Sequence, residues 1–148
     1  MATFDKIDTT GIKQLANSEF IDYADSDIVI IDDLRNFTKL QTIKVDFLLI
    51  IVVKSGRIAM RTNKVESIAS SNDIIICQPN TMMNECMFSI DLSAKAVCLS
   101  SQMARKMLHI GDVVDLSFYL KHKPIIHVDE STMNTFEKYH ALLTEQLL

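Results

Sequence analysis

The sequence contains no long run of apolar residues. Its longest unbroken run, Phe47 to Val53, has seven residues, whereas a helix that spans a bilayer needs roughly 20. The N-terminus also lacks the basic region followed by an apolar stretch that marks a secretory signal. We therefore expect no membrane segment and a cytoplasmic protein.

Cysteine is scarce, and its number is odd. Cys77, Cys86 and Cys98 show no spacing typical of metal ligands, which favours a reduced protein without disulfides. Cys77 and Cys98 lie in apolar runs, where a thiol usually packs as a small hydrophobe. Cys86 falls in a polar segment, 82–87, that we interpret as a loop, so a reactive thiol stays an alternative there. No Lys, Arg or His stands beside it to stabilise a thiolate, and we expect no catalytic residue.

Clusters of positive charge are also missing. The 15 Lys and Arg residues are scattered against 19 Asp and Glu residues, and the net charge is −4. Cations that neutralise phosphates supply most of the affinity of proteins for nucleic acids. We therefore expect no DNA contact from this segment.

What the sequence does contain is enough apolar material for one folded domain. The chain has 148 residues, of which 48% are hydrophobic and 23% charged, and a domain of this size buries roughly 70% of its unfolded surface. We predict a single domain over 1–148. Its strand-rich part is expected over 1–100 and its helical part over 101–148.

Short β-branched runs separated by turn residues predict the strands. They follow one another at spacings of about ten residues, as in sandwiches and barrels. Gly56 supplies the positive φ angle that a hairpin turn needs. The expected strands cover 28–31, 45–53, 57–62, 65–69, 74–77 and 94–99.

The hydrophobic period changes to that of helices after residue 100. We expect a helix from Ser101 that ends near Gly111, and a second helical stretch over 112–123, stopped by Pro124. A strand over 125–128 and a helix after Asp129 follow. The last helix meets no stop signal, so we expect the natural chain to continue beyond residue 148.

The middle and end of the sequence resemble a known family. The resemblance covers roughly residues 30–148, and its most specific part is a hairpin, an Asn-Asp turn, an Ile-rich strand and the segment Pro79-Asn80-Thr81, in that order. The stretches that carry it are FLLIIVVKSGRIAMRTNKVESIASSNDIIICQPNTMMNECMFS, AVCLS and LSFYLKHKPIIHVDE. They look like the N-terminal cupin-like domain of AraC-family transcriptional regulators of the Bacteroidetes type.

The resemblance implies both a fold and a function. The fold would be mainly β, a cupin-like double-stranded β-barrel (jelly roll) followed by C-terminal α-helices. The function would be to sense a small-molecule effector and to form a homodimer, while a C-terminal helix-turn-helix domain beyond residue 148 binds DNA.

Histidine is absent from the predicted strands between Val45 and Leu99. The four histidines are His109, His122, His127 and His140, whereas a cupin metal site needs imidazole and carboxylate ligands that converge inside the barrel. We therefore predict no metal, no cofactor and no enzymatic activity.

A group of methionines suggests where an effector would bind. Met60, Met82, Met83 and Met87 fall on or near predicted strands, and flexible thioethers suit adaptable apolar pockets. Plain core packing is the alternative reading. The predicted pocket consists of Phe47, Leu49, Met60, Asn80 and Met87.

The terminal helix carries an apolar stripe, which can be buried within the chain or against a second copy. The residues alone leave both solutions open, and the family resemblance favours a homodimer. The predicted interface consists of Phe136, Tyr139, His140, Leu143 and Leu147.

Two other functions compete with the sensor domain. A cyclic-nucleotide sensor also joins a β-roll to a long helix, but it needs a glycine-glutamate cassette and an arginine at the phosphate. Here Gly56 sits in a hairpin turn and Arg57 follows it without the cassette. A stand-alone cupin enzyme is disfavoured by the missing ligands, and a measured metal content would separate it from the others.

Overall fold

A computed structural model describes most of the chain, and the helical stretch predicted over 112–123 lies almost wholly outside the described residues. The residues described are 8–10, 23–24, 27–34, 43–107 and 123–147.

Eight strands pair as one long hairpin that is folded over itself, and successive pairs alternate between two sheets. From the tip outward the pairs are β6 (Ile58–Thr62) with β7 (Val65–Ala69), β5 (Phe47–Ser55) with β8 (Asp73–Cys77), β4 (Ile43–Val45) with β9 (Met82–Phe88), and β3 (Ile28–Ile31) with β10 (Ser93–Ser100). This nested antiparallel pairing is a jelly roll, so the predicted double-stranded fold is confirmed.

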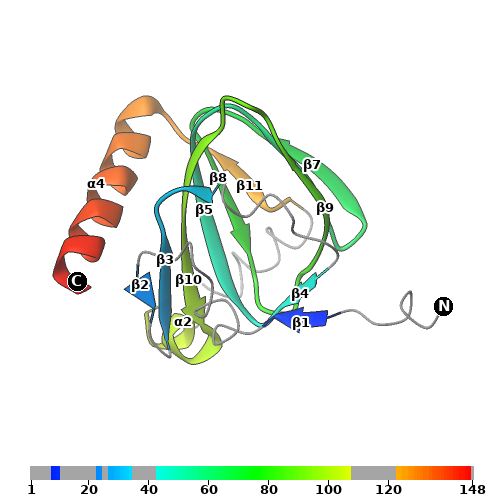
Figure 1. The fold of residues 1–148 in the computed structure, drawn as a ribbon, viewed down its shortest axis with the longest axis horizontal. Helices are drawn as coiled ribbons and strands as arrows, with labels where there is room; N and C mark the ends of the chain where they lie inside the picture. The colour runs from blue at the N-terminus through cyan, green and yellow to red at the C-terminus, as the bar shows by residue number, and fades with distance from the viewer. Residues whose placement is uncertain (1–7, 11–22, 25–26, 35–42, 108–122, 148) are drawn as a thin grey trace.

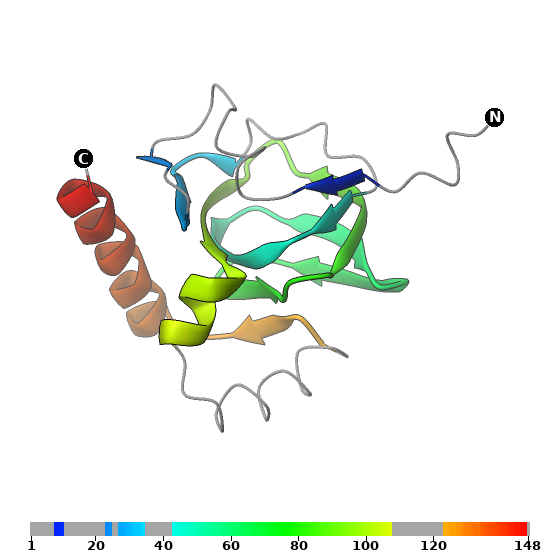
Figure 2. The same cartoon turned by 90° about the horizontal axis from the view of Figure 1, so that it is seen from below.

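Three more strands extend the two sheets. They are β1 (Asp8–Thr10), parallel to β4, β2 (Tyr23–Ala24), beside β3, and β11 (Ile125–His127), beside β8. The five-stranded sheet then runs β1-β4-β9-β6-β7 and the six-stranded sheet runs β11-β8-β5-β10-β3-β2. Among the described strands no pairing joins one sheet to the other, so the barrel is a sandwich of two facing sheets (Figures 1 and 2).

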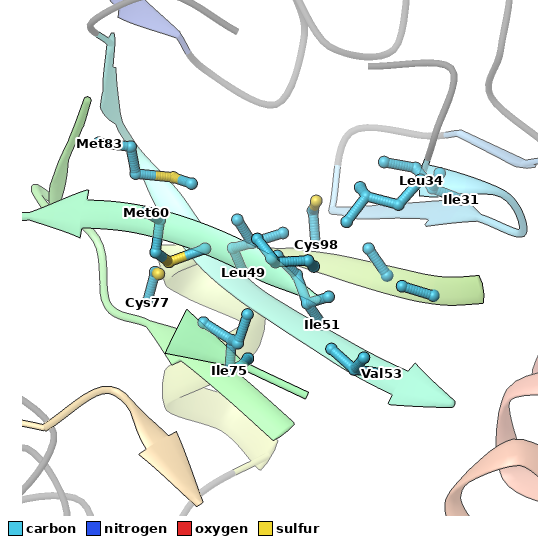
Figure 3. Close-up of a cluster of buried hydrophobic side chains, with 14 of the residues drawn as sticks. Ile31, Leu34, Leu49, Ile51, Val53, Met60, Ile75, Cys77, Met83 and Cys98 are labelled. Atoms are coloured by element: carbon cyan, nitrogen blue, oxygen red, sulfur yellow. The ribbon is translucent and has the colours of Figure 1, made fainter. Parts of the chain in front are cut away.

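The unbroken apolar run of β5 reflects burial on both faces of the six-stranded sheet. Phe47, Leu49, Ile51 and Val53 point into the core between the sheets, and the residues between them point outward to the helices. In the close-up of Figure 3, Leu49, Ile51 and Val53 lie along this strand, among side chains from neighbouring strands.

Two strand predictions need correction. The run from Val45 is not one strand, because the exposed Asp46 forms a bend at which the chain passes from β4 in one sheet to β5 in the other. The segment predicted as a loop is the strand β9. Its polar residues hid the alternation of a strand, and a register shift opposite Ala59–Arg61 adds one residue to it.

Two described helices lie on the outer face of the six-stranded sheet. They are α2 (Ser101–Met107) and α4 (Glu130–Leu147), and both predicted starts are confirmed. Asp129 caps α4, because its Oδ1 accepts a hydrogen bond from the backbone N of Thr132 at 2.7 Å. Figure 1 shows α4 running alongside the sheet. Neither helix is long and apolar enough to cross a membrane.

Candidate functional site

A cleft of about 280 Å³ opens at one end of the sandwich, where β6 and β8 end. We call it the polar cleft. Its lining includes the last residues of β8 and Pro124, which lies directly before β11. The lining residues are Thr62, Asn63, Ile76, Cys77, Gln78, Pro79, Asn80, Thr81 and Pro124.

Two buried threonines bring unpaired hydroxyl groups to this cleft. Thr62 is 5% exposed and Thr81 is 7% exposed. Neither hydroxyl has a hydrogen-bond partner among the described residues. Neither hydroxyl is among the described buried side-chain atoms that lack a partner, which are Asn84 Oδ1 and His140 Nε2, so both hydroxyls reach the open space of the cleft.

Two asparagines stand at the rim in turn conformations. Asn63 has a φ of 48° and starts the tight β6–β7 turn with Lys64, and Asn80 has a φ of 73°. The Asn63 Oδ1 accepts a hydrogen bond from the backbone N of Met82 at 3.0 Å. This bond fixes the carboxamide, and its Nδ2 has no partner among the described residues.

The described residues that line the polar cleft carry no charge. Cys77 is the ionisable side chain among them, and burial, with a smaller contribution from Cys86, raises the pKa of this thiol to about 12. The thiol is therefore neutral at physiological pH, and the cleft offers hydroxyls, carboxamides and the apolar surfaces of Ile76 and two prolines.

The residues of the predicted pocket are not gathered in one place. Phe47, Leu49 and Met60 are packed in the core between the sheets, where Figure 3 labels Leu49 and Met60. Asn80 is the member that lines the polar cleft. Met87 is 67% exposed, because the extra residue in β9 turns its side chain outward while Cys86 and Phe88 pack inward.

The residues of the predicted dimer interface divide between two faces of α4. His140 is 6% exposed and packs against the chain's own sheet, so its assignment to the interface is wrong. Leu143 is half-buried, and Phe136 and Tyr139 are exposed. The side chain of Leu147 lies outside the described residues.

The exposed apolar residues of α4 form what we call the outer stripe: Phe136, Tyr139 and Leu142. Tyr139 is 65% exposed, and Leu142 is exposed as well. The opposite side of the helix is fastened to the sheet by Met133, buried against Val52 and Ile74. The helix therefore has one apolar face that this chain covers and a second that it does not.

Cys86 does not fit the reading as a reactive thiol. It packs against the core from β9, and burial raises its pKa to about 11. Cys98 is buried too, and burial also raises its pKa. The raised pKa values keep all three thiols protonated at neutral pH, whereas the thiolate is the nucleophilic form.

The described part of the chain contains no group of three or more His, Cys, Asp or Glu side chains placed to hold a metal ion. Two of the four histidines lie among the described residues. His127 lies on β11 and His140 on α4, whereas His109 and His122 lie outside the described residues.

Sequence reasoning missed most of the cleft. Thr62, Thr81 and Pro124 were not predicted as site residues, because threonine in a strand and proline in a turn are ordinary there. The sequence feature that marks the cleft is the segment Pro79-Asn80-Thr81, which directly follows an Ile-rich strand. Of these three cleft residues, the predicted pocket included Asn80.

A scan against protein-family models gave no match, and a search among curated proteins gave none either. Among solved structures, the chain is similar to an RmlC-like cupin family protein with a double-stranded β-helix fold from Methanocaldococcus jannaschii. The two share 7% identity and a TM-score of 0.36, over 55% of this chain and 72% of that one.

Two vicilins are similar as well. Vicilin from Corylus avellana (hazelnut) shares 12% identity and a TM-score of 0.37 over 73% of this chain. Vicilin from Capsicum annuum shares 12% identity and a TM-score of 0.28 over 81% of this chain. The chain spans 39% and 48% of these two proteins. The assignment of the jelly roll therefore stands on the nested strand pairing itself.

Proposed function

We propose that this chain is a ligand-sensing and self-associating domain of a cytoplasmic transcriptional regulator of the AraC type, with DNA binding supplied by a separate C-terminal helix-turn-helix domain. The chain acts in this proposal as a binding module and not as an enzyme. The small-molecule effector occupies the polar cleft, and two copies pair through the outer stripe of α4.

One observation carries this proposal: a single short segment joins the cleft to the helix. Pro124 lines the polar cleft, and its carbonyl accepts a hydrogen bond from the backbone N of Ile76 at 2.8 Å. From Pro124 the chain runs through β11 directly into α4, which begins at Glu130. A ligand that shifts the cleft wall would therefore move the base of the helix that carries the outer stripe.

The outer stripe supports the self-association part. Large apolar side chains that cluster on a surface commonly mark an interaction site, and aromatic residues are enriched among those that carry binding energy. A two-fold axis would let the stripe of one copy cover the stripe of the other.

The composition of the cleft separates this proposal from a cyclic-nucleotide sensor. A bound cyclic phosphate requires a cation or a set of backbone amides that face its charge. Among the described residues, those that line the polar cleft include no Lys, Arg or His. The sensor of an uncharged effector is therefore the better reading.

Sedimentation equilibrium over a range of concentrations tests the self-association. We expect a monomer–dimer equilibrium for the wild type, and a dimer Kd raised tenfold or more for Tyr139→Glu. The matched control is Ala141→Glu, which places the same charge on an exposed position of the same helix, outside the stripe. A wild type that stays monomeric, or a Tyr139→Glu variant with unchanged Kd, would remove α4 from the interface.

A further inference from the structure

We propose that His140 is a proton-sensitive anchor of α4: protonation of its imidazole releases the second half of this helix, residues 139–147, from the six-stranded sheet. The first half of the helix stays attached. The release itself follows from how α4 is fastened to the sheet, and only its consequence for pairing rests on the proposed function.

Two buried side chains fasten α4 to the sheet. Among the described side chains of this helix, the buried ones are Met133 and His140. They are seven positions apart, so they lie on the same face of the helix, two turns from each other. Met133 packs against Val52 and Ile74 and holds the first half. The buried anchor of the second half is therefore an imidazole, which can take up a proton.

The buried imidazole has an unpartnered nitrogen. The Nε2 atom of His140 is buried and has no hydrogen-bond partner among the described residues. A neutral imidazole needs only one proton on its two ring nitrogens, whereas an imidazolium carries a proton on both. Protonation in place would therefore leave a charge, and an N–H group without an acceptor, in a buried contact, which is far more costly than the neutral ring.

The charged groups that act on the ring do not compensate such a charge. They are Lys95 on β10 and Asp32, directly after the last residue of β3. Burial lowers the pKa of His140 most, Lys95 lowers it further, and Asp32 opposes both. Asp32 forms its ion pair with Lys95, at 3.2 Å, and no described carboxylate forms an ion pair with the imidazole.

The direction and size of the effect follow from proton linkage. In the released half-helix His140 is in water, where its pKa returns to about 6.5. The released form thus binds the proton more tightly than the attached form, and the equilibrium moves toward release as the pH falls through about 6.5. At pH 5.5 the shift reaches up to about tenfold.

Self-association follows the same equilibrium. Tyr139 and Leu142 of the outer stripe lie in the second half of α4. Pairing about a two-fold axis requires this half to be attached to the sheet in both copies. The apparent dimer Kd therefore rises with the inverse square of the attached fraction, and a fall in pH weakens pairing.

Amide hydrogen exchange, measured by mass spectrometry on the whole chain in dilute solution, tests the release. Exchange is compared between the wild type and His140→Leu, which cannot take up a proton, at pH 7.5 and at pH 5.5. For residues 142–147 the intrinsic exchange rate at each pH is the same in both proteins, so the ratio of their rates reports opening of the helix. We expect this ratio to rise threefold to tenfold from pH 7.5 to pH 5.5.

Two further variants control the comparison. His140→Gln is a second neutral replacement and should give the same rise, so the result does not depend on the stability of one variant. His127→Gln removes the other described histidine, which is exposed, and should exchange like the wild type at both pH values.

Three outcomes would overturn the inference. The first is a ratio for 142–147 that is the same at both pH values. The second is a rise of equal size in the core strands β5 and β8, because it would report unfolding of the whole domain. The third is loss of the rise in His127→Gln, which would assign the titration to the other histidine.

Sedimentation equilibrium at the same two pH values separates this inference from the proposed function. We expect the dimer Kd of the wild type to rise threefold or more at pH 5.5, and that of His140→Leu to stay constant. An unchanged Kd of the wild type would overturn the consequence for pairing. A wild type that is monomeric at both pH values would overturn the proposed self-association, while the exchange ratio still decides the release.

Discussion

The buried carboxylate of Asp73 is hydrogen-bonded to the imidazole Nδ1 of His127, directly across the pairing of β8 with β11. The other carboxylate oxygen accepts a hydrogen bond from the backbone N of Ser70 at 2.7 Å. Asp73 thus ties together the β7–β8 turn and the strand that leads into α4. Asp73 and Pro124 lie at opposite ends of β11. The segment that joins the cleft to α4 is therefore bonded to β8 at both ends, through Ile76 at Pro124 and through Asp73 at His127.

Replacing Asp73 should destabilise the protein far more than replacing its partner. Asp73→Ala removes from a buried position the carboxylate that binds both the backbone N of Ser70 and the imidazole of His127, and we expect a loss of about 2 kcal/mol in the free energy of unfolding. His127→Ala should cost less than about 1 kcal/mol, because that side chain is 68% exposed and water replaces it. Urea denaturation measures both variants, and equal losses would contradict this asymmetry.

His140 makes the attachment of α4 to the sheet dependent on pH. Burial lowers its pKa, and the positive charge of Lys95 on β10 adds to that effect. The charge of Asp32 acts in the opposite direction but is smaller. Asp32 also forms an ion pair of 3.2 Å with Lys95.

The sign of the pH effect follows from the lowered pKa. Between the folded pKa and the ordinary value of about 6.5, the unfolded chain binds a proton that the folded chain does not. Stability is therefore lost as the pH falls through about 6.5. His140→Leu removes the titration, so its Tm relative to the wild type should rise between pH 7.5 and pH 5.5. A difference in Tm that stays constant over this range would contradict burial of a neutral His140.

Gly56 is a turn residue with no room for a side chain. Its φ is 80°, and a Cβ there would lie 2.6 Å from the Cα of Leu92 and 2.7 Å from the Oγ of Ser89. We expect Gly56→Ala to cost about 2 kcal/mol or more in urea denaturation, from backbone strain and this clash. Asn72→Gly is the control, because Asn72 has a φ of 67° and glycine adopts that angle readily. Equal stability of Gly56→Ala and the wild type would show that the turn can rearrange.

The sequence predicted most strands because each has its own local signal. β7 lies at its expected residues, β3 as well, and the start of α4 follows Asp129 as its cap implies. The sequence of β9 lacks the short β-branched run that marks the other strands. Asn84 and Glu85 interrupt its apolar residues, and the extra residue that turns Met87 outward depends on the pairing with β6, which local sequence does not encode.

The site was harder to predict than the fold. Thr62 and Thr81 are 19 positions apart in the chain and meet only because β6 and the segment before β9 end at the same side of the sandwich. His140 was placed on the wrong face of α4 because helical spacing groups it with Phe136 and Leu143. Which face of an amphipathic helix meets the sheet is decided by packing, here by Met133 against β5 and β8.

The central claim, that a second copy pairs through the outer stripe of α4, can be tested by site-directed cross-linking. Leu142→Cys places a thiol on the stripe, and Ile90→Cys places one in the turn between β9 and β10, outside the stripe, at a residue that is 99% exposed. The native thiols are buried or half-buried with raised pKa values, so a short bismaleimide should react mainly at the new cysteine. We predict a covalent dimer for Leu142→Cys and none for Ile90→Cys, and a covalent dimer formed only by Ile90→Cys would contradict the account.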